Sequence, residues 1–130
     1  MIVADASAVV CLLIDGGAHG DQARAQYAAH DLAYPALLPF EVTNVLRRLE
    51  HRGTVERAEA RRAIRRLGQL RGHEYAFDDV ATRVWELRQN LSAYDAAYVA
   101  LAELIDRPLL TFDRRLQGAP GTRCQFVDTR

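Results

Sequence analysis

The sequence predicts an α/β domain in three layers, with a short, mostly parallel sheet flanked by helices. Short apolar runs, each stopped by an acid, a proline or a glycine, alternate with longer segments whose apolar residues recur at helical spacing. The chain has 130 residues, of which 49% are hydrophobic, so it can bury one core. Because no repeat, linker or low-complexity stretch divides it, we expect a single domain over residues 1–130.

The first half of the chain predicts two strands and three helices. Residues 2–5 form a short apolar strand that ends in Asp5, and Ser7 can cap the helix that follows over residues 8–14. Pro39 suits the first turn of a long helix, and a proline also stops the second strand. The remaining ranges are a helix over 21–29, a strand over 31–35 and the long helix over 39–51.

The second half predicts a similar alternation. Ser92 and Asp95 have the S-x-x-D spacing of a capping box, and the helix after them, over 96–102, is apolar nearly all round. Such a helix is usually central and buried. The other expected elements are helices over 56–71 and 79–90, an extended link over 73–77, a strand over 109–112 followed by a short helix, and an edge strand over 124–127.

The composition excludes several kinds of chemistry. The formal net charge is zero, so a bulk basic field for nucleic acid is absent, and any contact with nucleic acid must come from a local basic patch. All 17 basic residues are arginine, and the absence of lysine excludes every mechanism that needs a catalytic lysine. No apolar run approaches the roughly 20 residues that span a bilayer, and the first residues lack the pattern of a secretion signal. We therefore expect a cytoplasmic protein with no membrane partner.

The cysteines and histidines are not expected to carry the chemistry. Cys11 and Cys124 lie in apolar surroundings without metal-ligand spacing, and a reduced thiol in such a setting is usually a small core residue. An isolated histidine in a polar segment more often lies on the surface than in a catalytic site. All four histidines have this setting: His19, His30, His51 and His73.

Several acids stand where a parallel sheet would place functional residues. Asp5 ends one predicted strand and Asp113 follows another, and in open parallel sheets the functional crevice lies beyond the carboxyl ends of the strands. Asp95 is the only charge between Leu91 and Glu103. A lone carboxylate near a core is costly unless something such as a hydrated Mg²⁺ ion compensates it. Each acid also fits a local role as a cap, a first-turn acid or a turn former, and spacing alone leaves both interpretations open.

Four segments carry a more specific pattern: Ile2-Val3-Ala4-Asp5-Ala6-Ser7, Glu41-Val42-Thr43-Asn44-Val45-Leu46, residues 91–102 and residues 109–116. In this order they resemble the PIN-domain family, and specifically the VapC toxins of bacterial toxin–antitoxin modules. The segment over 91–102 is the most specific, and together they span nearly the whole chain. The resemblance implies a short parallel sheet with flanking helices and a metal-dependent endoribonuclease, a hydrolase of RNA phosphodiester bonds.

The resemblance also implies an acidic site for Mg²⁺, for which Mn²⁺ is a suitable substitute. Its implied residues are Asp5 and Asp95 as metal ligands, Glu41 and Asp113 beside them, and Ser7 and Thr111 at the small hydroxyl positions. The bound ion would polarise a phosphodiester and lower the pKa of a water that attacks phosphorus in line, which leaves a 5′-phosphate. Glu41 or Asp113 would orient that water or complete the metal shell.

One departure from the family pattern follows Asp113. Many relatives carry a further acid a few residues later, whereas this chain has Arg114-Arg115-Leu116-Gln117. A second metal would therefore have fewer ligands.

The expected partners depend on the surface. Arginines crowd the outer side of the predicted helix over 56–71: Arg57, Arg61, Arg62, Arg65 and Arg66. They can form a solvated face with local pairs to Glu56 and Glu59, or a contact surface for RNA phosphates or an acidic partner. The resemblance implies a VapB-type antitoxin that blocks the pocket, and a homodimer. Tyr94 and Tyr98 flank the proposed pocket, where core packing is favoured over base stacking because large side chains four apart on a buried helix usually face the core.

Three other functions remain open from the sequence. A phosphatase with Asp5 as its nucleophile would carry a second acid at position 7 and a later lysine, but this chain has Ser7 and no lysine. A non-catalytic interaction domain would use the acids only as caps and would bind no metal. A nuclease of the same family could also act in RNA processing without an antitoxin.

Overall fold

The computed structural model describes residues 1–130 and has a four-stranded sheet at its centre. All pairings between neighbouring strands are parallel. In spatial order the strands are β3 (Gly72–Tyr75), β2 (Leu32–Pro35), β1 (Ile2–Ala4) and β4 (Leu109–Leu110). Parallel neighbours need crossover connections, and helices supply them. This arrangement confirms the predicted fold class.

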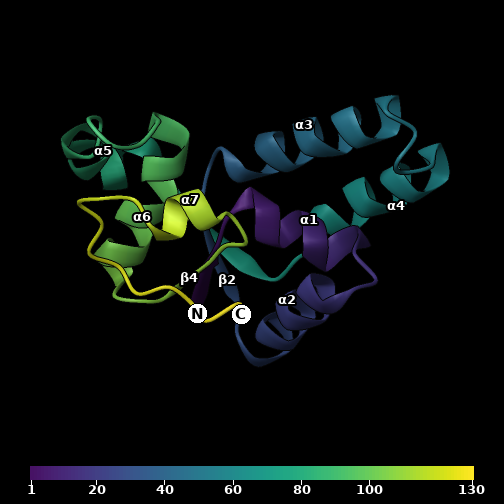
Figure 1. Cartoon of the computed structure of the whole chain (residues 1–130), viewed down its shortest axis with the longest axis horizontal. Helices are drawn as coiled ribbons and strands as arrows, with labels where there is room; N and C mark the ends of the chain where they lie inside the picture. Colours follow the sequence, from purple (N-terminus) through teal and green to yellow (C-terminus); the bar gives the residue numbers. More distant parts are fainter.

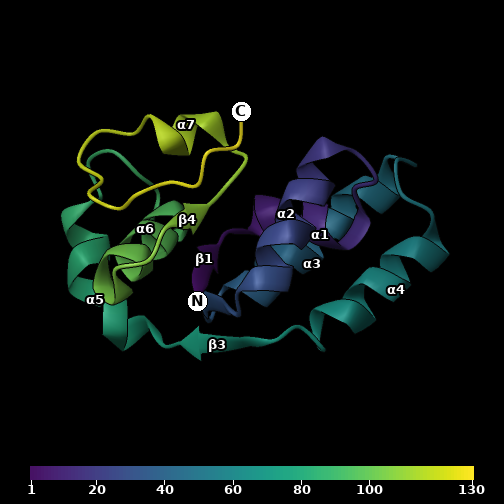
Figure 2. The ribbon, with the colours of Figure 1, turned by 90° about the horizontal axis from the view of Figure 1, so that it is seen from below.

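Helices cover both faces of the sheet and give the molecule its layers. They are α1 (Ala6–Ile14), α2 (Ala18–Ala29), α3 (Leu38–His51), α4 (Arg57–Leu67), α5 (Phe77–Glu86), α6 (Ala93–Ile105) and α7 (Arg114–Gln117). α6 contacts β1 and β2 and also packs against α5, whereas α1 packs against α2, α3 and α4. In Figures 1 and 2 the sheet accordingly lies between the α5–α6 layer and the layer that contains α1 and α2.

The core lies against both faces of β1. Every residue of this strand is buried, and so is every residue of α6 from Ala96 to Ala102. The alanines of α6 allow its backbone to approach the sheet, while Tyr98 and Leu101 fill the space beside them. The prediction of a central, buried helix in this part of the chain is therefore confirmed. None of the helices combines the length and the apolar character that crossing a membrane requires.

The structure corrects the predicted cap of the first helix. Asp5, rather than Ser7, is the N-cap of α1, because its carboxylate accepts a hydrogen bond from the backbone N–H of Ala8 at 3.0 Å. Ser7 lies inside the first turn, where its hydroxyl is free to donate elsewhere.

Several elements in the second half also differ from the prediction. The expected link over 73–77 is instead the strand β3, which pairs with β2 along its whole length. The expected strand over 124–127 is reduced to a single bridge between Leu109 and Phe126. α5 covers Phe77–Glu86 instead of residues 79–90. These segments are short, so the neighbouring strands and helices that they meet in space decide their conformation more than local propensity does.

Candidate acidic active site

The parallel sheet brings four acids toward its carboxyl-terminal edge. Asp5 directly follows β1, and Asp113 comes shortly after β4. Glu41 lies in the first turn of α3, which follows β2, and Asp95 lies in the first turn of α6. The strands point the same way, so the segments that leave β1, β2 and β4 all begin at one edge.

Asp5 is the most enclosed of these acids, with 6% of its surface exposed. Its Oδ1 accepts hydrogen bonds from Ser7 Oγ at 2.6 Å and from the Ala8 N–H at 3.0 Å. Its Oδ2 accepts a hydrogen bond from Thr111 Oγ1 at 2.5 Å, and this hydroxyl in turn accepts from the Asp113 N–H. The two hydroxyl groups therefore hold the Asp5 carboxylate in one orientation and join the end of β1 to the end of β4.

Glu41 is held by a residue that sequence reasoning assigned only to core packing. Tyr98 is 1% exposed, yet its hydroxyl donates to Glu41 Oε1 at 2.5 Å. The bond links the first turn of α3 to the buried part of α6 and leaves Glu41 Oε2 without a partner in the chain. The available signal was the polar tip of a tyrosine on an otherwise apolar helix, since a buried tyrosine hydroxyl usually finds a partner.

Asp113 is the only one of the four acids with a cationic partner. Arg115 Nη2 lies 3.1 Å from Asp113 Oδ2, and the Arg115 backbone N–H donates to Oδ1 at 2.9 Å. No arginine or histidine lies within ion-pair distance of Asp5, Glu41 or Asp95. A hollow of about 400 Å³ opens beside α7, and Asp95, Asp113 and Arg115 are among the residues that line it.

The pKa shifts indicate that the acids share one electrostatic site. Burial raises the pKa values of Asp5, Glu41 and Asp95. Negative charge on Asp95 raises the pKa values of Asp5 and Glu41 further, and that on Asp113 does the same to Asp95. For Asp113 burial alone would raise the pKa, but hydrogen bonds and the positive charge of Arg115 together lower it. Asp5, Glu41 and Asp95 therefore lie near one another without an ion pair, although the more distant charge of Arg115 lowers the pKa of Asp95.

The carboxylate oxygens do not form a closed metal cage. No three of the acids bring one oxygen each within 4.8 Å of one another. Mg²⁺ dehydrates reluctantly, usually keeps several waters and is held by one or two carboxylates directly. The observed spacing therefore suits a hydrated ion better than a fully dehydrated one.

Comparison with known proteins places the chain in a family. The family model described as PIN domain matches residues 2–121. The chain belongs to the PIN-domain family. This PIN domain is 42% identical over 127 residues to the VapC ribonuclease Mb0985 of Mycobacterium bovis, and the match covers 98% of this chain and 97% of that protein. The predicted resemblance to VapC proteins is therefore confirmed.

Solved structures agree with this assignment. The crystal structure of PAE2754 from Pyrobaculum aerophilum has a TM-score of 0.64 and 31% identity, and the match covers 88% of this chain and 76% of that one. A toxin–antitoxin complex from Klebsiella pneumoniae has a TM-score of 0.67 at 20% identity, covering 100% of this chain and 98% of that one. At 20% identity, the similarity to the Klebsiella pneumoniae complex concerns the fold alone.

The two tyrosines near the acids of this PIN domain have different environments. Tyr98 packs in the core as expected, but Tyr94 is 63% exposed, so its predicted core position is wrong. Tyr94 lies in the first turn of α6, before the helix enters the core, and four-residue spacing does not reveal this difference.

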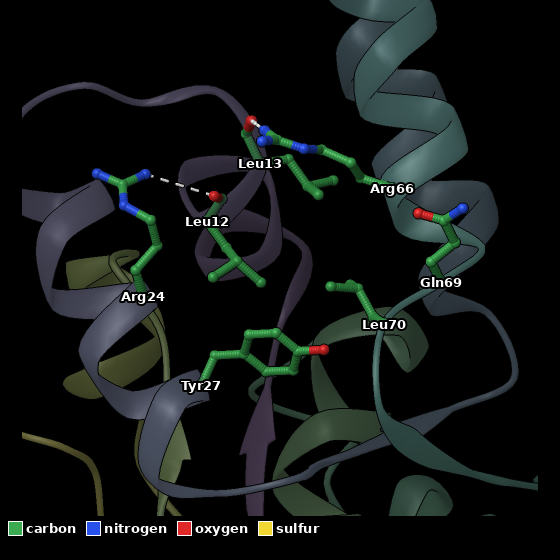
Figure 3. A pocket seen from close by; sticks show the side chains of 7 residues that line it. All are labelled: Leu12, Leu13, Arg24, Tyr27, Arg66, Gln69 and Leu70. Atoms are coloured by element: carbon green, nitrogen blue, oxygen red, sulfur yellow. Dashed lines mark hydrogen bonds between the residues drawn. The ribbon is translucent and has the colours of Figure 1, made fainter.

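The arginine face of the PIN domain lies on α4, which follows α3 at the end away from α6 and α7 (Figure 1). Its arginines are all exposed, and only Arg57 approaches an acid, Glu50, at 3.8 Å. The expected pairs with Glu56 and Glu59 do not form. Arg66 instead donates to the Leu13 carbonyl at 3.3 Å. Arg66 and Arg24 both line a hollow of about 540 Å³ whose other walls are mainly apolar (Figure 3).

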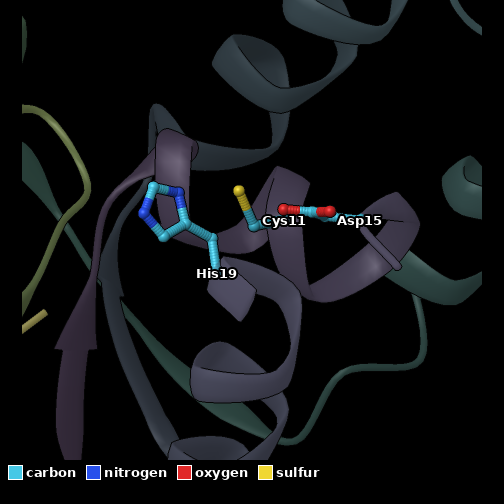
Figure 4. Close-up of side chains that lie close together, drawn as sticks. All are labelled: Cys11, Asp15 and His19. Carbon is cyan, nitrogen blue, oxygen red and sulfur yellow. The ribbon is translucent and has the colours of Figure 1, made fainter. Parts of the chain in front are cut away.

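Sequence reasoning missed one cluster that involves Cys11. Both cysteines are free as expected, but each is half-buried rather than fully enclosed in the core. The structure brings Cys11 together with Asp15 and His19, and one ligand atom from each lies within 4.8 Å of the other two (Figure 4). The available signal was the repeated spacing of four residues, which puts Cys11 and Asp15 on one side of a helix.

Proposed function

We propose that this chain is a metal-dependent endoribonuclease that acts as the toxin of a VapBC toxin–antitoxin system. The observation that carries the proposal is a group of partly buried carboxylates without a cationic partner: Asp5, Glu41 and Asp95. Such groups are costly in a fold and are typical of a site that binds a cation. The substrate class, RNA, comes from the relatives, which are named as ribonucleases.

The acids fit a hydrated Mg²⁺ ion, with Mn²⁺ as a substitute that has similar ligand preferences. Their oxygens are hard ligands, and a cation would relieve the repulsion that raises their pKa values. Asp5 and Asp95 would hold the ion, and Glu41 and Asp113 would lie beside it. When bound, the ion would polarise the phosphodiester and lower the pKa of a water molecule.

The residues around the acids would position the reacting groups. Ser7 and Thr111 hold the Asp5 carboxylate in one orientation. Tyr98 does the same for Glu41 and leaves Oε2 free to accept a hydrogen bond from the attacking water. That water would attack phosphorus in line, and the bond from phosphorus to the ribose 3′-oxygen would break. The product would carry a 5′-phosphate because the bond to the 3′-oxygen breaks, and no 2′,3′-cyclic phosphate would form because water, rather than the ribose 2′-hydroxyl, is the nucleophile.

Asp113 has a different part in this proposal. Its pKa is lowered by Arg115, so it stays ionised when its neighbours take up protons. It can therefore orient water or complete the metal shell over a wider pH range than Glu41.

The proposed partners are an RNA substrate, a VapB-type antitoxin and a second copy of the chain. Arginines of α4 without an ion pair offer cations to RNA phosphates or to an acidic segment of the antitoxin: Arg61, Arg62, Arg65 and Arg66. The antitoxin is proposed from the resemblance to VapC proteins, since the chain is 42% identical to a VapC ribonuclease. A single nuclease domain over residues 1–130 and a cytoplasmic location complete the proposal.

The direct test is cleavage of total RNA by the purified chain with Mg²⁺, with EDTA, and with the Asp95→Asn variant. We expect cleavage that requires the metal and falls at least about hundredfold in the variant, since even outer-shell changes at metal sites reach this size. Glu103→Gln is the matched control, because this acid lies on the same helix but away from the site.

Two results would contradict the proposal. Cleavage in EDTA would exclude the metal mechanism, whereas no cleavage by the wild type together with no Mg²⁺ binding by calorimetry would favour a non-catalytic interaction domain. End analysis of the products checks the chemistry, because a 2′,3′-cyclic phosphate would exclude water as the nucleophile.

A further inference from the structure

The cluster in Figure 4 combines three types of side chain that bind transition metals. Cys11 lies in the last turn of α1, Asp15 is the C-cap of that helix, and His19 lies in the first turn of α2. One ligand atom from each lies within 4.8 Å of the other two. In a tetrahedral zinc site, bonds of about 2.0–2.3 Å place ligand atoms about 3.3–3.8 Å apart. Metal binding would therefore have to draw the three ligand atoms closer together.

The turn between α1 and α2 holds the cluster together. The Gly17 N–H donates to Asp15 Oδ1 at 2.7 Å, which fixes the carboxylate. Gly20 lets α2 come close, because a Cβ atom at this position would lie 1.9 Å from the Asp15 carbonyl oxygen. The His19 ring stacks on Phe112, with centroids 4.1 Å apart and an interplanar angle of 9°. Two of the three side chains are therefore oriented before a ligand arrives.

We infer that Cys11, Asp15 and His19 form a binding site for a divalent transition-metal ion of the zinc type, separate from the acidic site. Thiolate, imidazole and carboxylate together suit Zn²⁺, whereas Mg²⁺ prefers oxygen ligands alone. Three protein ligands leave a fourth position for water. His19 is exposed and Cys11 is half-buried, so the ion can enter from solvent.

The same residues do not suit covalent catalysis by the thiol. A nucleophilic cysteine needs a lowered pKa, whereas burial, reinforced by the nearby Asp15 carboxylate, raises the pKa of Cys11 to about 11.

The proposed metal site contacts the acidic site through Phe112. This residue directly precedes Asp113, and its N–H donates at 3.0 Å to Ser7 Oγ, the hydroxyl that donates to Asp5. An ion that fixes His19 also fixes the ring on which His19 stacks. Zinc binding should therefore order this edge of the acidic site and raise the melting temperature, without taking part in hydrolysis.

Co²⁺ titration of the metal-free chain tests the site without reference to activity. Co²⁺ occupies zinc sites, and a thiolate ligand gives an intense sulfur-to-cobalt charge-transfer absorption in the near ultraviolet. We expect this band at one equivalent of Co²⁺ in the wild type and its loss in Cys11→Ser. His19→Gln should weaken Co²⁺ binding by at least about tenfold, the smallest effect expected even for an outer-shell change.

The chain offers matched controls for both variants. Cys124 is also free and half-buried, with a pKa raised by burial to about 11, so Cys124→Ser should keep the band. His30→Gln controls for the loss of an exposed histidine. Asp5→Asn should keep the band as well, which separates this site from the acidic one.

Several outcomes would overturn the inference. They are a wild type without the thiolate band, a band that persists in Cys11→Ser, and a band lost in Cys124→Ser or in Asp5→Asn. Thermal melting provides a second measurement: Zn²⁺ should raise the melting temperature of the wild type but not that of Cys11→Ser. An equal rise in both would contradict the site.

Discussion

Helix α6 carries an acid near each end, and only one of the two acids forms an ion pair. Glu103, near the carboxyl end, lies 2.6 Å from Arg83 Nε and also accepts from the Arg123 N–H at 2.8 Å. Asp95, in the first turn, has no arginine or histidine within ion-pair distance. Both side chains are partly buried. A partly buried carboxylate usually needs a partner, and only Glu103 has one.

The difference separates an acid with a structural partner from an acid that we propose to be a metal ligand. Arg83 also donates to the Gly121 carbonyl at 2.8 Å, so the Glu103 pair joins α5, α6 and the segment after α7. Asp95 has a local hydrogen bond with Ser92 but no ion pair, and the negative charge of Asp113 raises its pKa. One end of α6 therefore contributes an ion pair to the fold, while the acid at the other end has none, as the proposed metal site requires. Four changes, taken from the largest expected effect to the smallest, test this contrast.

The largest effect is expected from Asp5→Asn. RNA cleavage should fall at least about hundredfold, because a metal ligand is lost while Ser7 and Ala8 keep their acceptor. The stability of the fold should not fall in this variant. The raised pKa of Asp5 means that the folded state binds its proton more tightly than the unfolded state, so ionisation above that pKa costs stability. Asparagine removes this cost, and thermal melting at neutral pH should show an equal or higher melting temperature. A clear fall would mean that the hydrogen bond from Thr111 to the carboxylate stabilises the fold by more than ionisation of Asp5 costs.

Glu103→Ala should lower the stability of the fold and leave RNA cleavage nearly unchanged. It leaves the partly buried Arg83 and the Arg123 N–H without their acceptor, so the free energy of unfolding should fall by about 1–3 kcal/mol. RNA cleavage per folded molecule should stay within about twofold of the wild type. Urea denaturation measures the first effect, and Asp128→Asn is the control, since the exposed pair with Arg130 should contribute less than about 1 kcal/mol. An equal loss of unfolding free energy in Glu103→Ala and Asp128→Asn would contradict a structural role for the Glu103 pair.

Tyr98→Phe should change the pH profile rather than abolish activity. The Tyr98 hydroxyl lowers the pKa of Glu41 against the larger effect of burial, so its removal raises that pKa further. Because Glu41 is needed as a carboxylate, the acidic limb of the cleavage profile should move to higher pH, and activity at neutral pH should fall by less than about tenfold. Tyr94→Phe is the control, because Tyr94 is exposed and has no bond to an acid. A profile that moves equally in both variants would exclude Tyr98 as a positioning residue.

Arg115→Ala should have the smallest effect. Arg115 is 88% exposed in its side chain, so its pair with Asp113 contributes little, and cleavage should change by less than about fivefold. Without this cation the pKa of Asp113 should rise, because hydrogen bonding and charge from Arg115 now lower it. The charge of Arg115 also lowers the pKa of Asp95, so in the variant cleavage should be lost at a higher pH than in the wild type as the pH falls. A loss as large as that of Asp5→Asn would show that Arg115 contacts the substrate.

The sequence by itself determined the fold class, the buried α6 and the acids at the strand ends. Each of these depends on local order along the chain: an apolar run, a helical period, or an acid directly after a strand. The absence of lysine likewise excluded whole classes of mechanism without a structure. The predictions for the cap of α1 and for β3 were wrong because both features depend on hydrogen bonds that the types of the neighbouring residues do not reveal.

Only the tertiary structure decided which of these residues meet. The strand order places β1 between β2 and β4, which brings Asp5 and Thr111 into contact although 106 residues separate them. The contact between Tyr98 and Glu41 depends in the same way on how α3 and α6 pack, as the pairing of Glu103 depends on α5. A sequence pattern describes which face a side chain occupies on its own element. The partner on another element is decided by packing between elements, and that is why the acids could be named from the sequence while their pairing could not.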